Sequence, residues 1–272
     1  MNWFRIALAC ALGAGSAIGQ VPDLALLKRA AESGNAEAQF RYAQTFSASS
    51  GRRDWLLAAA NQGHGPAEDQ LAWEMNWSLF STHFPKEPLR STHLRKNSAQ
   101  MRDALAWAAL AADKGFPRSR LLLAFAYANG YVVPADPLEA YKWLTLARDL
   151  PEIARISSGG LKERLIKSMS LEEVQAAERR AAAYRPGNTA PTIYRQIVLP
   201  SLKLNGTATM NGETVALING KRIKPGEQVE VIADGVTIQL YLVSVERNAA
   251  TITLPPMKEE FVLRNAPTTR LP

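Results

Sequence analysis

Apolar residues recur at helical spacing through the first two thirds of the chain. Between residues 118 and 128 they follow one face of a helix, and Gly130 provides a typical helix end. A second helix is predicted from Asp136 as the N-cap and Pro137 at the first helical position, with an apolar stripe that reaches Ala147. Neither helix can cover its stripe alone. The pattern therefore predicts a helical hairpin that stacks on other hairpins.

The same local order occurs at four places in the chain. Each consists of an alanine pair, a glycine or turn, and a following apolar stretch. Anchored on the second alanine, the unit recurs at Ala31, Ala60, Ala112 and Ala147, in steps of 29, 52 and 35 residues. Small residues at the anchors allow neighbouring helices to approach closely. The long middle step indicates an insertion in the second unit.

This pattern resembles the Sel-one-like repeat family, a relative of the tetratricopeptide repeats. The third unit carries the resemblance through Gly115, Leu123, Tyr127, Gly130, Val133, Asp136, Ala140, Trp143 and Ala147, with partial matches at Gly34 and Tyr42 and at Gly63, Ala67 and Leu71. The resemblance implies an α-solenoid over residues 20–185 that binds other proteins and has no active site. The helical sequence of residues 169–187 is predicted to cap this array.

The insertion, residues 78–101, is basic together with the residue that follows it. Its cationic residues are Lys86, Arg90, Arg95, Lys96 and Arg102, and Glu87 is the one acidic residue among them. We expect these five cations to contact a partner that is acidic, either a protein or an anionic envelope surface. The alternative is a solvated loop without a binding role.

Composition changes beyond residue 186. Residues 186–200 are rich in Pro, Gly and Thr and predict a flexible linker, whereas residues 201–265 alternate in the manner of strands. Asn219-Gly220 predicts a two-residue hairpin turn. The predicted fold class is therefore a multi-domain α and β protein: an α-solenoid of helical hairpin repeats, then a small antiparallel β-barrel of five or six strands, with a tail at residues 266–272.

The predicted β-domain also resembles the small periplasmic β-domain shared by type II secretion scaffold components and type IV pilus pilot proteins. The resemblance is carried by Ala216, Ile218, Asn219, Gly220, Gly226 and Val229. It implies a module that docks a partner in an envelope assembly. The alternative is a small barrel that only terminates the chain.

The N-terminal segment, Met1–Gly19, has the pattern of a cleaved secretory signal. Arg5 precedes an apolar run, and Ala17 and Gly19 occupy the small-residue positions of a cleavage site. We therefore expect a periplasmic or secreted protein, with an N-terminal membrane anchor as the alternative. The one cysteine, Cys10, lies inside this segment, so the cleaved chain would have no thiol chemistry.

The sequence contains no recognisable catalytic or nucleic-acid-binding motif. A net charge of +7 permits an acidic partner, but no zinc-ligand spacing or recognition helix accompanies it. The histidines, His64, His83 and His93, lack nearby acidic or thiol ligands, so we expect no metal and no cofactor. Glu172 and Glu173 are adjacent on a helix and point apart, which makes them a poor acid–base pair.

Four aromatic residues, Trp107, Trp143, Tyr127 and Tyr141, are expected to fill the repeat core, with a partner groove as the alternative. The sequence thus predicts a non-catalytic protein–protein interaction scaffold that takes no small-molecule substrate and no nucleic acid. A structural or regulatory part of a secretion or pilus assembly, docking through the β-domain, is the second hypothesis. An enzyme or enzyme-accessory subunit is the third.

Overall fold

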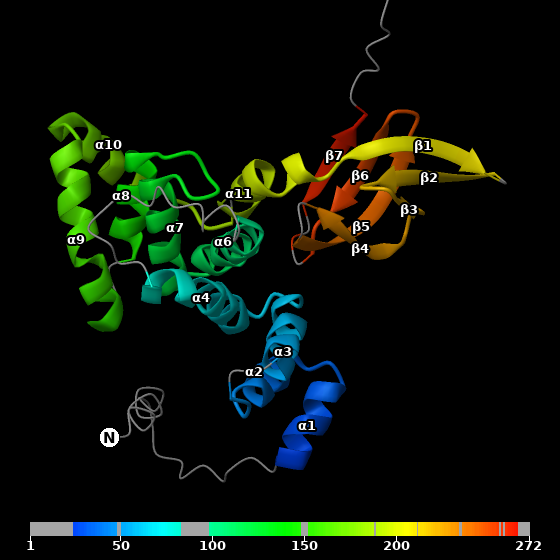
Figure 1. Ribbon diagram of the computed structural model, residues 1–272, viewed down its shortest axis with the longest axis horizontal. Coiled ribbons are helices and arrows are strands. Elements are labelled where there is room, and N and C mark those ends of the chain that lie inside the picture. The colour runs from blue at the N-terminus through cyan, green and yellow to red at the C-terminus, as the bar shows by residue number, and fades with distance from the viewer. Residues whose placement is uncertain are drawn as a thin grey trace, which may run out of the picture.

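A computed structural model describes residues 24–47, 50–82, 98–147, 152–187, 189–210, 212–233, 236–255, 257 and 259–265. In these residues helices come first and strands follow (Figure 1). The predicted signal peptide, the predicted tail and residues 83–97 of the insertion lie outside the described residues. None of the described helices combines the length and the apolar character that crossing a membrane requires.

The helical region is built from antiparallel neighbours. Its helices are α1 (Leu24–Glu32), α2 (Ala36–Ala43), α3 (Ser50–Ala60), α4 (Gly65–Thr82), α6 (Ser98–Asp113), α7 (Pro117–Asn129), α8 (Pro137–Leu146), α9 (Glu152–Ser168), α10 (Leu171–Ala182) and α11 (Thr189–Ile197). The main contacts join α2 to α3, α4 to α6, and α7 to α8, and α10 packs on α8. This confirms the helical-hairpin array.

The third hairpin forms as its sequence predicts. Gly130 ends α7 in the left-handed conformation, with φ 69°, and its N–H donates to the Ala126 carbonyl. Asp136 caps α8: its Oδ1 accepts from the N–H of Leu138 at 2.9 Å and of Glu139 at 3.0 Å. These contacts satisfy backbone groups that the ends of the two helices would otherwise leave unpaired.

The anchor alanines and the four aromatic residues lie in the core. Ala31, Ala60 and Ala112 are fully buried, and Ala147 is 1% exposed. Trp107, Tyr127, Tyr141 and Trp143 are all at most 7% exposed. Their predicted place in the repeat core is therefore confirmed. Small alanines and large rings together contribute to the buried core between the helices.

Successive hairpins are joined by polar side chains next to their turns. The turn glycines Gly34, Gly63 and Gly115 share positive φ values of 94°, 80° and 96°, which a residue with a Cβ adopts only under strain. They therefore mark structurally equivalent turns. A side chain next to each later turn contacts the preceding unit. The residue directly before the turn glycine of one unit forms a hydrogen bond with the residue five positions after the turn glycine of the unit before it.

This contact occurs twice, and we call its four residues the turn ladder: Gln39, Gln62, Glu68 and Lys114. Gln62 Nε2 donates to Gln39 Oε1 at 2.7 Å, and Lys114 Nζ donates to Glu68 Oε1. Lys114 Nζ also donates to the carbonyl of Gly63 at 2.8 Å. The second contact places a charge in the core, because the Glu68 side chain is fully buried.

The strands form two antiparallel sheets. One holds β1 (Leu204–Met210), β2 (Glu213–Ile218) and β3 (Lys221–Ile223), and the other holds β4 (Gln228–Ala233), β5 (Val236–Glu246), β6 (Ala249–Thr253) and β7 (Glu260–Arg264), each sheet in chain order. The prediction of one closed barrel with five or six strands is corrected: in the described residues two separate backbone ladders are present. The predicted Asn219-Gly220 turn joins β2 to β3 with positive φ at both residues, as this turn type requires.

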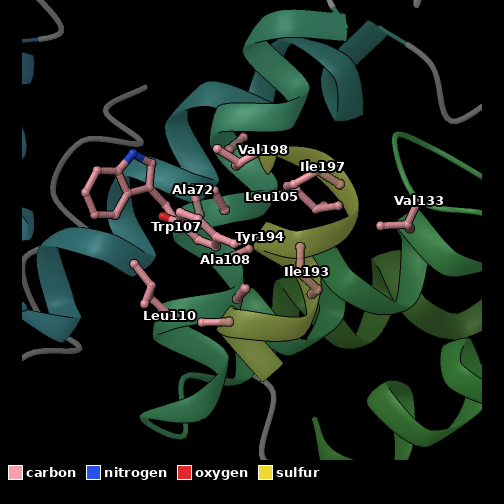
Figure 2. Close-up of a cluster of buried hydrophobic side chains, with 14 of the residues drawn as sticks. Ala72, Leu105, Trp107, Ala108, Leu110, Val133, Ile193, Tyr194, Ile197 and Val198 are labelled. Carbon is pink, nitrogen blue, oxygen red and sulfur yellow. The ribbon is translucent and has the colours of Figure 1, made fainter. Parts of the chain in front are cut away.

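The predicted flexible linker is also corrected, because it contains a helix that packs on the array. Ile193, Tyr194 and Ile197 of α11 are buried, and Figure 2 shows them beside Leu105 and Ala108 of α6. A 3₁₀ turn at Leu199–Ser201 then leads into β1. The helical and β-regions are thus connected by an ordered, buried element.

A carboxylate from the array holds the start of α11. Asp113 Oδ2 accepts from the N–H groups of Thr189 and Ala190, both at 3.1 Å, and its Oδ1 accepts from the Tyr184 hydroxyl at 2.6 Å. A negative charge at a helix N-terminus satisfies unpaired N–H groups and is favoured by the helix dipole. This cap comes from α6, which is far away in the sequence.

Candidate protein-binding surface

The predicted basic surface is represented in the structure by one residue. Arg102 lies on α6, where its side chain is half-buried and already interacts with another group of the chain. Lys86, Arg90, Arg95 and Lys96 lie outside the described residues. Their grouping with Arg102 therefore stays a prediction.

His64 has a packing role in the turn between α3 and α4. Its Nε2 lies 2.9 Å from Glu37 Oε2, and its ring lies 4.9 Å from the Phe40 ring. The hydrogen bond to His64 is the main cause that lowers the pKa of Glu37. His83 and His93 lie outside the described residues. Within the described part of the chain, no group of three or more His, Cys, Asp or Glu side chains has an arrangement that could hold a metal ion.

A hollow of about 320 Å³ lies between α8, α9 and α10. The residues from α8 that line it are Tyr141, Leu144 and Thr145. Lys162 lines it from α9, and Glu178 lines it from α10. The three α8 residues are three and four positions apart, so they share one face of that helix. The hollow therefore combines an aromatic ring, an aliphatic side chain, a hydroxyl and two opposite charges.

The two charges of the hollow are not paired with each other. Lys162 Nζ lies 6.0 Å from the centre of the Tyr141 ring, a weak cation–π contact. Among the residues that the structure describes, neither Lys162 nor Glu178 forms an ion pair. Two opposite charges in the lining of one hollow can bind a group that presents a donor and an acceptor close together.

Two of the helices that line this hollow, α8 and α10, are linked by ion pairs outside it. Arg180, two residues after Glu178, lies 3.1 Å from Glu139 Oε1 and 3.7 Å from Asp136 Oδ2, so α10 is tied to the start of α8. Glu139 also pairs with Lys142. Because α8 and α10 are held together before a ligand arrives, binding would require little movement of these two helices relative to each other.

Sequence reasoning missed this hollow. The sequence predicts Tyr141 in the core, with a partner groove as the alternative, and places Leu144 three residues later on the same apolar stripe. The sequence has no signal that brings Lys162 and Glu178 together, because their proximity depends on how α9 and α10 fold back over α8. The capping box that starts α10, Ser170 with Glu173, is a local sequence signal, and it locates the helix but not its neighbours.

No protein-family model and no curated protein sequence matches this chain. Among solved structures, it is similar to the crystal structure of c5321, a protective antigen present in uropathogenic Escherichia coli strains that displays an SLR fold. The identity is 18% and the TM-score 0.28, over 69% of this chain and 53% of that chain. This chain thus spans about half the length of c5321. Because so low a TM-score reflects little superposition, the helical-hairpin architecture rests on the contacts of this chain alone.

Proposed function

We propose that this chain is an exported, non-catalytic scaffold that binds a partner protein through the hollow between α8, α9 and α10. The partner contributes an extended or loop segment whose main-chain or side-chain polar groups lie between Lys162 and Glu178. Leu144 and the Tyr141 ring receive an apolar side chain of the same segment. The basic insertion provides additional attraction for an acidic partner or envelope surface.

The hollow with its unpaired charges is the observation that carries this proposal. Helical-hairpin arrays leave extended surfaces open between neighbouring units, and such surfaces are typical protein-binding sites. The volume of about 320 Å³ is at the lower end of the range for ligand pockets, which suits one or two side chains of a peptide. Export is supported by the signal-like sequence of Met1–Gly19.

The binding proposal is tested by selecting peptides against the purified chain that begins at Gln20 and ends at Pro272. A library of short random peptides is displayed, and the affinities of the selected peptides are measured by fluorescence anisotropy. We expect Lys162→Glu and Glu178→Lys each to reduce the affinity for the selected peptides at least tenfold, because each replaces one of the two charges of the hollow by its opposite.

Two further variants serve as matched controls on α10. Arg179→Glu and Glu172→Lys reverse exposed charges on that helix at positions that do not line the hollow, and we expect both to keep the affinity unchanged. Equal losses in all four variants would exclude the hollow as the binding site, because Arg179 and Glu172 do not line it. Peptides that bind the Lys162→Glu and Glu178→Lys variants with unchanged affinity would exclude the hollow as the binding site.

A further inference from the structure

The two edges of the four-stranded sheet differ in how their backbone groups are used. At the β4 edge, Lys221 Nζ donates to the Glu230 carbonyl at 2.8 Å, and Asn219 Nδ2 donates to the Ile232 carbonyl at 3.0 Å. Both donors belong to the β2–β3 hairpin of the other sheet. The β4 edge is therefore already occupied by polar groups of the same chain.

The β7 edge is open in the described part of the chain. Asn265 N–H donates to the Asn248 carbonyl at 3.1 Å, in register with the β6–β7 ladder. Backbone groups alternate sides along an antiparallel strand. The N–H and C=O groups of Glu260, Val262 and Arg264 must therefore face away from β6. No described residue bonds to them, and an unpaired edge of this kind is a template for another strand.

The exposed side chains of β7 are arranged symmetrically about Val262. Val262 is 52% exposed at the centre of the strand, and Glu260 and Arg264 are exposed two residues before and after it. Neither Glu260 nor Arg264 forms an ion pair with a described residue. The inward side chains between them, Phe261 and Leu263, are both buried and apolar.

This arrangement is complementary to itself when the strand runs antiparallel to a second copy. With Val262 opposite Val262, Glu260 lies opposite Arg264 of the other copy, and Arg264 lies opposite its Glu260. Each of the three opposed pairs can exchange two backbone hydrogen bonds. On the inner face Phe261 lies opposite Leu263 of the other copy, but both are already buried within their own chain, so the pairing depends on the backbone and on the exposed face of β7.

We propose that β7 pairs with β7 of a second copy of this chain around a two-fold axis at Val262. The two four-stranded sheets then form one continuous antiparallel sheet. Figure 1 shows β7 at the edge of its sheet, where such an addition takes place. The interface is isologous, because the same strand contributes both halves. The proposal is independent of the peptide-binding hollow.

The test uses charge reversal at both ends of the strand, with sedimentation velocity of the chain that begins at Gln20. We expect the wild-type chain to form dimers. Glu260→Arg places two arginine pairs opposite each other in a homodimer, and Arg264→Glu places two glutamate pairs. Each variant alone should therefore dimerise at least tenfold more weakly than the wild type.

An equimolar mixture of the two variants makes the decisive measurement. In a mixed dimer every charge again faces its opposite, so we expect the mixture to dimerise as the wild type does. Glu230→Arg on the opposite edge is the matched control and should leave the dimer intact. A monomeric wild-type chain at concentrations of about 100 µM would overturn the proposal, since specific homodimers form well below this level. A dimer that survives Glu260→Arg would overturn it too.

Discussion

The helical array and the β-region hold their parts together by different means. Neighbouring hairpins of the array are joined by side chains, namely the buried alanines and the turn ladder with its buried Glu68. Strands of the β-region are joined by backbone ladders, and side chains of Asn219 and Lys221 link its two sheets. A side-chain contact is removed by one substitution, whereas a backbone ladder is not. Single changes should therefore destabilise the array more than the sheets.

Helix α11 belongs to both regions. Its buried face packs on α6, while Arg195 pairs with Glu259 and lies 5.7 Å from the centre of the Phe261 ring of β7. A division of the chain into separate helical and β-domains stays a prediction. If the two regions unfold together, α11 is the element that couples them.

The largest effect is expected for Ile193→Ala. Ile193 is 1% exposed in the core between α11 and α6, so truncation removes buried methyl groups and leaves a cavity. We expect the free energy of unfolding to fall by about 3 kcal/mol. Urea denaturation followed by circular dichroism measures it, and limited proteolysis should cut residues 186–196 sooner than in the wild type.

Gln196→Ala is the control for this prediction, because Gln196 is on the exposed side of α11. It should change the free energy of unfolding by less than about 0.5 kcal/mol. Equal losses for Ile193→Ala and Gln196→Ala would show that α11 is not packed on the array. The prediction of a flexible linker from composition would then be correct.

The second effect concerns the charge buried in the turn ladder. Burial raises the pKa of Glu68, and the hydrogen bond from Lys114 opposes that shift. Lys114→Ala would leave a fully buried carboxylate without its cation. Since Lys114 is itself 36% exposed, we expect the free energy of unfolding to fall by about 2 kcal/mol, which is below the range for fully buried pairs.

Lys28→Ala is the matched control, because Lys28 pairs with Glu32 on an exposed helix surface. Its effect on urea denaturation should be close to zero. The double variant Lys114→Ala with Glu68→Gln should recover part of the stability, since no charge is then buried alone. If Lys114→Ala proved as harmless as Lys28→Ala, the array would not depend on its turn ladder.

A third effect is expected in the β-region at Asn219. Its Oδ1 accepts from Lys203 N–H at 2.6 Å, and its Nδ2 donates to the carbonyls of Ser201 and Ile232, both at 3.0 Å. It also has a φ of 48°, which asparagine tolerates better than alanine. Asn219→Ala should reduce the free energy of unfolding by about 1.5 kcal/mol, because these contacts are partly exposed to water.

Gln228→Ala provides the comparison for Asn219, since Gln228 is exposed and its one side-chain hydrogen bond to a described residue, Gln239, is 3.5 Å long. We expect no measurable change in its denaturation midpoint. A loss at Asn219 larger than the loss at Lys114 would reverse the ranking of the two regions. The sheets, and not the array, would then be the part that depends on single side chains.

Local signals in the sequence located most of the fold. Gly130, Asp136 and the Asn219-Gly220 turn each act on the adjacent backbone, so their effects are visible in a short stretch of sequence. The sequence also contains the α11 pattern, since Ala190, Ile193, Tyr194 and Ile197 have helical spacing. The proline and glycine content of this segment is typical of linkers, so it predicted a linker in spite of the helical spacing.

Tertiary contacts could not be predicted in the same way. Asp113 caps α11 across 76 residues, and no local rule pairs the two segments. The hollow depends likewise on three helices that approach one another only in the fold. Barrel closure was predicted from strand alternation, but alternation shows which face is buried and not which strands are hydrogen-bonded.

The smallest expected effect is a change in pH dependence at Asp103 of α6. Burial raises the pKa of Asp103 to about 6, and Arg53, 4.0 Å away, offsets this only in part. The folded state therefore binds this proton more tightly than the unfolded state, so stability falls as the pH rises from about 4 to about 6. The full shift corresponds to about 3 kcal/mol. Because the side chain retains 29% exposure, we expect about 1 kcal/mol.

Asp103→Asn stays neutral at every pH and removes this dependence. It should match the wild type at pH 4 and exceed its free energy of unfolding by about 1 kcal/mol at pH 7, as urea denaturation at the two pH values would show. Asp54→Asn, at an exposed position of α3, is the control and should not produce such a gain. A variant less stable than the wild type at pH 7 would mean that the Arg53 contact outweighs burial at Asp103. The array would then gain stability from this charge, in contrast to the cost of burying Glu68.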